Sequence, residues 1–172
     1  VKDIDQSPDT YLNAIGYVFK VFDHNTQDSG NISYGMRINQ ERYFVKTAGF
    51  PDERPRRPQH PERVSLLRNA VQLHQSFSHH SLPHLYQVIE SPEGPILIYQ
   101  WVDGELIRTE SSKRNDPKSS FQRFRRLPAA KIIHVLDVIY DLHYQLAKLG
   151  WIAVDFYDGC MVYDFEREKL HL

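Results

Sequence analysis

The segment PDERPRRPQHP, residues 51–61, constrains the fold of this chain more than any other stretch. Four of its eleven residues are proline. Because proline fixes φ and has no N–H to donate, the segment suits neither a central strand nor the interior of a helix. We therefore expect a connector at 51–61, with Pro61 as the first residue of the helix that follows.

The residues before this connector favour strands. Three short runs, at 17–23, 32–39 and 42–48, are rich in aromatic and β-branched residues and are bounded by turn residues. The polar loop DHNTQDSGN joins the first two runs, and a tight turn joins the second to the third. The pattern predicts a three-stranded antiparallel meander.

The residues after the connector predict a helix and then a hairpin. Apolar residues recur at spacings of three and four over 61–76, as in an amphipathic helix. Two apolar runs follow at 84–91 and 94–102, joined by a Ser-Pro-Glu-Gly turn. We expect these two runs to pair as antiparallel strands.

The last third of the chain predicts a polar linker, a long helix and a second hairpin. The linker covers 107–126. The helix begins at Pro128 and ends at Gly150, with Lys148 in its last turn, where a cation is favourable. Residues 151–154 are expected to be extended, and residues 161–172 to form a short hairpin.

The composition is typical of an ordinary soluble protein, with 41% hydrophobic and 25% charged residues. The net charge of −1 favours neither nucleic acid nor an anionic membrane as a partner. The single cysteine, Cys160, excludes an internal disulfide and fits a reducing compartment, so we expect a cytoplasmic protein. No run approaches the roughly 20 apolar residues that span a bilayer, and the N-terminus is unlike a secretory signal. Since the chain begins without Met and ends on KLHL, we expect both ends to be trimmed.

The order of these elements resembles the protein-kinase-like fold over the whole chain. It is similar in particular to bacterial phosphotransferases of the aminoglycoside and choline kinase type, and to bacterial serine/threonine-kinase-like proteins. The resemblance implies an α+β fold. Residues 1–101 would form an N-terminal lobe with a five-stranded antiparallel sheet and one helix, and residues 102–172 the hinge, the linker and part of a helical C-terminal lobe with the catalytic loop.

This resemblance also implies a function, ATP-dependent transfer of the γ-phosphoryl group to a hydroxyl acceptor, with Mg²⁺ as the metal. The acceptor would be a small molecule or a protein Ser/Thr. Neither nucleic acid nor a membrane is expected as a partner. The alternative is a catalytically inactive kinase-like domain that binds nucleotide or another protein.

The expected phosphate contacts come from a strand lysine and a loop. YFVKTAG has the form of the family's Val-Ala-Ile-Lys motif, and Lys46 occupies its lysine. The glycine-rich motif of protein kinases is absent. In its place, Ser29 and Gly30 would present a hydroxyl and main-chain N–H groups to phosphate. The helix position that carries the lysine's glutamate partner in the family is Asn69 here, and Glu62 could substitute only if the helix is shifted.

The expected adenine contacts come from the hinge, in the sequence LIYQWVDGELI. The resemblance places Tyr99 at the gate of the nucleotide site and Gln100-Trp101-Val102 in the hinge itself. We therefore expect Tyr99, Gln100 and Val102 to contact the nucleotide.

The expected catalytic loop lies in GWIAVDFYDGCMVYDF, where Asp155 would orient the acceptor hydroxyl. Ala153 replaces the family's histidine, and Cys160 occupies the position of the asparagine that holds Mg²⁺. A thiolate is a poor ligand for Mg²⁺, so the nearby Asp158 is the better candidate. The family's second metal-binding aspartate would follow Leu172, so the chain is expected to be truncated before it. We expect Asp164 to be a hairpin-turn residue.

Three other patterns suggest weaker hypotheses. Four histidines within eleven residues invite a metal site, but their spacing fits no common zinc pattern: they are His74, His79, His80 and His84. Seven basic residues between 108 and 126 could meet phosphates, although a solvated face is the simpler interpretation: they are Arg108, Lys113, Arg114, Lys118, Arg123, Arg125 and Arg126. Asp155 and Asp158 could form a hydrolytic carboxylate pair.

Overall fold

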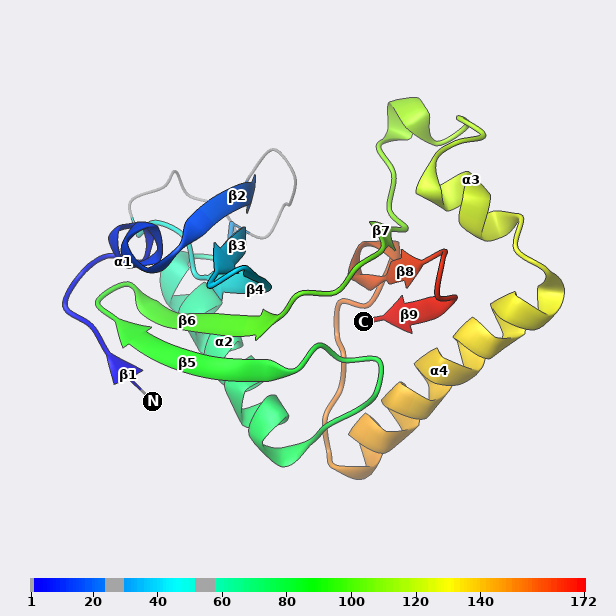
Figure 1. Cartoon of the computed structure of the whole chain (residues 1–172). Helices are drawn as coiled ribbons and strands as arrows, with labels where there is room; N and C mark the ends of the chain where they lie inside the picture. The colour runs from blue at the N-terminus through cyan, green and yellow to red at the C-terminus, as the bar shows by residue number, and fades with distance from the viewer. Residues whose placement is uncertain (1, 24–29, 52–57) are drawn as a thin grey trace. The chain divides into compact units, whose positions relative to one another are not determined.

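The computed structural model describes residues 2–23, 30–51 and 58–172 (Figure 1). The chain forms two compact units. The first unit comprises residues 1–78 and 83–101, and the second comprises residues 79–82 and 102–172. The chain therefore enters the second unit briefly at His79–Leu82 before it returns to complete the first.

The first unit is built on a six-stranded sheet with the order β1-β5-β6-β4-β3-β2. The predicted meander and the predicted hairpin at 84–102 are confirmed, and both are antiparallel. The strands are β1 (Lys2–Asp3), β2 (Tyr17–Phe22), β3 (Ile32–Ile38), β4 (Glu41–Thr47), β5 (Leu85–Ser91) and β6 (Gly94–Gln100).

The expectation of five antiparallel strands and one helix is wrong in two respects. A sixth strand, β1, pairs with β5 in parallel, and the Ile4 N–H donates to the Glu90 carbonyl at 3.0 Å. With only two residues, β1 has no alternation for a sequence pattern to detect. The second difference is α1 (Pro8–Ile15), whose start has a readable signal: Ser7 caps the helix and Pro8 opens it.

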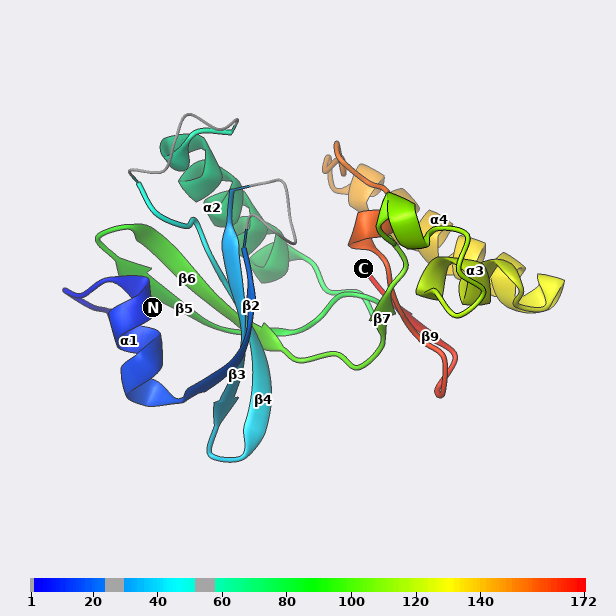
Figure 2. The ribbon, with the colours of Figure 1, turned by 90° about the horizontal axis from the view of Figure 1, so that it is seen from above.

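The two helices of this unit cover opposite faces of the sheet (Figure 2). Helix α1 packs on one face, where Leu12 meets the buried side chain of Val45 among others. Helix α2 (His60–Ser76) packs on the other, where Leu67 joins Leu97 and Tyr99. Since side chains alternate along a strand, Val45 on the α1 face places Lys46 on the α2 face.

The turn between β3 and β4 holds two residues in the left-handed region, Asn39 at φ 48° and Gln40 at φ 71°. Positive φ at both central residues is the geometry of a tight hairpin turn, for which Asn-Gly is the preferred pair. Glutamine tolerates this conformation poorly because its Cβ crowds the following carbonyl.

Replacing Gln40 with glycine should therefore raise the free energy of unfolding by about 1 kcal/mol, because glycine adopts positive φ without steric cost. Urea denaturation checks the prediction. Gln72→Gly on the exposed face of α2 is the matched control, and it should lower the stability by about 1 kcal/mol. Destabilisation by both substitutions would contradict the argument from the turn.

The second unit is built on two helices and a small sheet. Its core joins the long helix to the sheet through Val135, Val138 and Tyr163. The long helix and the hairpin match their predictions, and residues 151–154 lie outside helices and strands. The elements are β7 (Glu105–Leu106), α3 (Ser120–Arg125), α4 (Ala129–Lys148), β8 (Val162–Asp164) and β9 (Lys169–His171), with 3₁₀ turns at Ser111–Lys113 and Asp158–Cys160.

The helices were also compared with the dimensions of a bilayer. Within residues 2–23, 30–51 and 58–172, none is both long and apolar enough to cross a membrane.

Candidate functional site

Lys46 lies half-buried near the end of β4. It stands opposite Ser33 of β3 on one side and Leu97 of β6 on the other. Directly opposed residues share a face of the sheet, so Ser33 and Lys46 lie on the face where Leu97 packs beside α2. The Lys46 ammonium group can form an ion pair with an anion bound on this face beside α2.

Ser33 is an unusual neighbour for this lysine. Its side chain is 1% exposed, and within the described part of the chain its Oγ has no hydrogen-bond partner. Buried hydroxyls are normally hydrogen-bonded, and an unmade bond costs roughly 1–3 kcal/mol. A polar ligand bound next to Lys46 would supply the missing partner.

Of the loop expected to cover the phosphates, the structure describes Asp23, Gly30 and Asn31. Ser29 lies outside the described residues. Gly30 is buried with φ +73°, and a Cβ there would lie 3.1 Å from the Nη1 of Arg63. The end of this loop therefore lies against an arginine that was not considered from the sequence.

Arg63 holds the connection between β4 and α2. It is 3% exposed, and its guanidinium donates to three carbonyls: Ala48 at 2.6 Å, Pro58 at 3.0 Å and Phe50 at 3.1 Å. No sequence pattern indicates this role, because the position falls among polar residues at the start of a helix. The arginine thus supplies donors to three carbonyls that lie outside helices and strands.

The two positions of α2 considered as partners of Lys46 are both exposed. Asn69 is exposed on α2. Glu62 is also exposed, and its carboxylate accepts a hydrogen bond from the Gln59 N–H at 2.7 Å, which caps the helix. The carboxylate of Glu62 therefore serves the N-terminus of α2.

The three predicted adenine contacts differ in burial and in hydrogen bonding. Tyr99 is a core residue, 8% exposed, and burial raises the pKa of its phenol. The Gln100 N–H donates to the His84 carbonyl at 2.8 Å, and the Gln100 side chain accepts from the His84 N–H at 3.4 Å. The main chain of Gln100 thus holds β5 to β6, while Val102 is half-exposed at the start of the second unit's main segment.

The loop with Asp155 follows α4 in the second unit. Asp155 is exposed, and its carbonyl accepts a hydrogen bond from the Cys160 thiol at 3.4 Å. The Cys160 N–H donates to the Tyr157 carbonyl at 2.9 Å. These two hydrogen bonds of Cys160 close the 155–160 loop. Asp155 remains exposed to solvent in this loop.

Arg108, which precedes this loop in the chain, contacts two of its residues. Its N–H donates to the Asp158 carbonyl at 3.2 Å, and its guanidinium donates to the Tyr157 hydroxyl at 3.1 Å and lies 5.3 Å from the centre of that ring. The sequence indicated Arg108 only as part of a basic stretch. Here it positions the 155–160 loop.

A metal site in a protein requires several donor side chains that come together. Among the residues that the structure describes, no three His, Cys, Asp or Glu side chains come together as a metal group. Asp158 and Cys160 thus lack a third ligand, and the four histidines are divided between the units, with His74 and His84 in the first. Binding of Mg²⁺ by Asp158 and Cys160 therefore stays a prediction.

Three side chains of the second unit are arranged like a Ser-His-Asp triad. His79 lies 2.6 Å from the Ser81 hydroxyl and 3.0 Å from the Asp141 carboxylate. The hydrogen bonds from His79 and then Gln145 lower the pKa of Asp141. Ser81 is 0% exposed, and its hydroxyl already pairs with the His79 ring. The arrangement fastens residues 79–82 to α4.

Asp164 is a hairpin-turn residue, as predicted. Its carboxylate accepts from the N–H groups of Glu166 at 2.9 Å and Arg167 at 3.0 Å, and from the Arg167 guanidinium at 2.9 Å. The main-chain bond to Arg167, followed by the guanidinium bond, lowers the pKa of Asp164. These bonds stabilise the β8–β9 turn only while the carboxyl is ionised.

Asp164→Asn should therefore destabilise the protein at neutral pH, and the difference from wild type should shrink with acid. A carboxyl with a lowered pKa stabilises the fold above its unfolded pKa of about 4 and loses this effect as the pH falls through the folded value. Urea denaturation between pH 7 and 3 checks this. Exposed Glu166→Gln is the control, and a difference for Asp164→Asn that stays constant with pH would contradict the assignment.

Comparison with known proteins adds no family to this geometry. Neither the family models nor the curated protein sequences that were searched match the chain.

Proposed function

We propose that the chain is a kinase-like domain that binds ATP for transfer of the γ-phosphoryl group to a hydroxyl acceptor, a small molecule or a protein Ser/Thr. The observation that carries the proposal is the pair formed by Lys46 and Ser33. A half-buried lysine stands opposite a buried hydroxyl without a partner, on the sheet face that α2 covers. A phosphate oxygen would accept a hydrogen bond from the Ser33 hydroxyl, and its charge would attract the Lys46 ammonium.

The arrangement of the first unit supports the same function. Helix α2 connects the third strand of the meander to the β5–β6 hairpin, which is the order expected for a kinase-like lobe. The extra strand β1 and helix α1 lie before the meander in the chain and leave that order intact. The kinase-like fold is part of the proposal.

Each of these residues would have a separate role in phosphoryl transfer. The Lys46 ammonium would neutralise charge on the α- and β-phosphates, and the Ser33 hydroxyl would donate to a phosphate oxygen. The exposed Asp155 carboxylate would accept the proton of the acceptor hydroxyl and orient its oxygen. Cys160 and Arg108 would position Asp155 by keeping its loop closed.

The test is the stabilisation of the chain by ATP with and without MgCl₂, followed by thermal unfolding. At ATP tenfold above Kd, binding should stabilise the fold by about 1.4 kcal/mol, which corresponds to an increase in Tm of about 3–5 °C. Adenosine should stabilise less, because it has no phosphate to meet Lys46. No change in Tm with about 10 mM ATP, a concentration that saturates millimolar sites, would overturn the proposal.

A second candidate function is a nucleotide-binding or protein-interaction domain without catalysis. Two observations favour it: Asn69 replaces the expected glutamate, and the Cys160 thiol bonds to the Asp155 carbonyl where a magnesium ligand is expected. ATP binding that does not respond to Mg²⁺, with no release of ADP in the presence of hydroxyl acceptors, would favour this candidate over the transferase.

A further inference from the structure

A β-bulge in β2 turns Lys20 toward the face of the sheet that α2 covers. The antiparallel register of β2 with β3 shifts between Val18 and Lys20. Val18 packs against the core on the α1 face, and in a regular strand Lys20 would share that face. The shift instead places Lys20 opposite Gly35, which shares the α2 face with Ser33. Bulges beside functional sites re-aim side chains in this way.

Gly35 makes room for the bulge. A Cβ at Gly35 would lie 2.6 Å from the ring of Phe19, closer than a Cβ can approach without a shift of the ring. The Phe19 ring also meets the ring of Trp101 edge-on, with the two centroids 5.1 Å apart. Ring packing over a glycine therefore holds Phe19 on the α2 face, and Lys20 follows it there.

The Lys20 ammonium lies beside an aromatic ring next to Ser33. Its Nζ is 4.9 Å from the centre of the Phe22 ring, which is a cation–π contact. Phe22 stands directly opposite Ser33, and its ring centroid is 5.9 Å from that of Phe44. Phe44 packs against the cluster formed with α2. These contacts agree with the register and place Lys20 on the same face as Ser33 and Lys46.

Lys20 and Lys46 come from the strands on either side of Ser33. Lys46 lies on β4 and Lys20 on β2, while Ser33 lies on β3 between them. Neighbouring strands are about 4.8 Å apart, so β2 and β4 are roughly 10 Å apart. Lysine carries its charge on a flexible four-carbon stem, so both ammonium groups can reach one chain of anionic groups that crosses this face.

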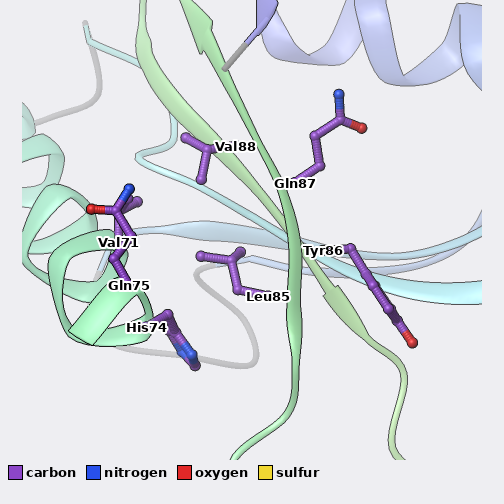
Figure 3. A pocket seen from close by; sticks show the side chains of 7 residues that line it. All are labelled: Val71, His74, Gln75, Leu85, Tyr86, Gln87 and Val88. Carbon is purple, nitrogen blue, oxygen red and sulfur yellow. The ribbon is translucent and has the colours of Figure 1, made fainter. Parts of the chain in front are cut away.

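The α2 face offers a different environment toward β5. A pocket of about 160 Å³ lies there between β5 and the last turns of α2, and Leu85 and Val88 point into it from the strand (Figure 3). Burial, and to a lesser degree His84, lowers the pKa of His74 in this pocket, which favours the neutral imidazole at pH 7. Of the described residues that line the pocket, none is a lysine or an arginine. Charge on this face therefore favours a path for phosphates from Lys46 toward β2.

We infer that Lys20 binds a second phosphate group of the ligand held by Lys46 and Ser33, so that the site selects a nucleoside polyphosphate over a monophosphate. The inference rests on the proposed function and adds a specificity-determining residue to it. One phosphate can pair with Lys46 and accept from Ser33, whereas a polyphosphate also carries charge to the second ammonium.

The test compares the Kd for ATP with the Kd for AMP by isothermal titration at low salt, where exposed charges are least screened. Wild type should bind ATP more tightly than AMP. Lys20→Ala should weaken ATP binding about fivefold, as for the loss of one exposed ion pair, and AMP binding less than about twofold. Lys20→Arg keeps the charge and should keep the preference for ATP.

The matched control exchanges two neighbouring residues, as Lys20→Val with Val21→Lys. Val21 stands opposite Tyr34, a core residue of the α1 face, so the lysine moves to the other face while the net charge stays the same. The exchange also keeps a lysine on the edge strand, which separates ligand binding from protection of that edge. It should weaken ATP binding as much as Lys20→Ala.

Thermal unfolding of each variant without ligand separates loss of binding from loss of fold. Wild-type affinity for ATP in Lys20→Ala or in the exchange variant would overturn the inference and leave the proposed function intact. Equal weakening of ATP and AMP by Lys20→Ala would overturn it as well. A wild type that binds no ATP at about 10 mM would overturn the proposed function, and the inference with it.

Discussion

Arg63→Met should lower the free energy of unfolding by about 3 kcal/mol or more. The guanidinium of Arg63 is buried and donates to the carbonyls of Ala48, Phe50 and Pro58, none of which lies in a helix or strand. Methionine would fill much of the volume but would leave these carbonyls without their donor. Hydrogen bonds from a charged group contribute roughly 1.5–3 kcal/mol each, and their loss is only partly additive.

Urea denaturation measures this difference, and Arg68→Met is the matched control. Arg68 lies on the same helix, but its side chain is 58% exposed and bonds to Glu90 at 3.1 Å. An exposed ion pair of this kind contributes at most about 1 kcal/mol. Similar losses in the two variants would mean that Arg63 does not hold the connection between β4 and α2.

Lys46→Ala should weaken ATP binding at least tenfold, and this is the second large effect. The ammonium is assigned to neutralise phosphate charge beside Ser33, and a charge-assisted hydrogen bond to phosphate contributes roughly 1.5–3 kcal/mol. Isothermal titration with ATP measures the change in Kd. Adenosine binding should change far less, because that ligand carries no phosphate.

Lys148→Ala is the control for the change in net charge, since Lys148 is exposed in the last turn of α4. It should leave the Kd for ATP unchanged. If wild type binds ATP and Lys46→Ala binds it equally well, the phosphates lie elsewhere and the assignment of Lys46 fails. This outcome differs from a wild type that binds no ATP, which would overturn the proposed function itself.

The role of Cys160 bears on the choice between a transferase and a binding domain. Its thiol closes the Asp155 loop, and among the described residues no metal group forms around it. The residue type alone indicated a poor magnesium ligand. The hydrogen bond to the Asp155 carbonyl adds a reason for a thiol at this position, because a small donor there keeps the loop closed.

The position of Lys46 in the fold could be inferred from the sequence, whereas its neighbours could not. Lys46 was predicted from a short strand motif, and alternation along β4 places it on the face that α2 covers. The contribution of Ser33 was not predictable, because it depends on the register between β3 and β4, which brings the two residues opposite each other. Arg63 was missed for the same reason, since its acceptors are carbonyls that sequence patterns do not report.

The sequence by itself determined the elements whose signals are local. The meander, helix α2, the β5–β6 hairpin, helix α4 and the last hairpin all follow from periodicity, prolines and turn residues within a few positions. The tertiary structure alone decided the parallel pairing of β1 with β5, the opposite placement of α1 and α2, and the partners of Lys46 and Arg63. These features join residues far apart in the chain, and their energy comes from packing and register, which no local pattern records.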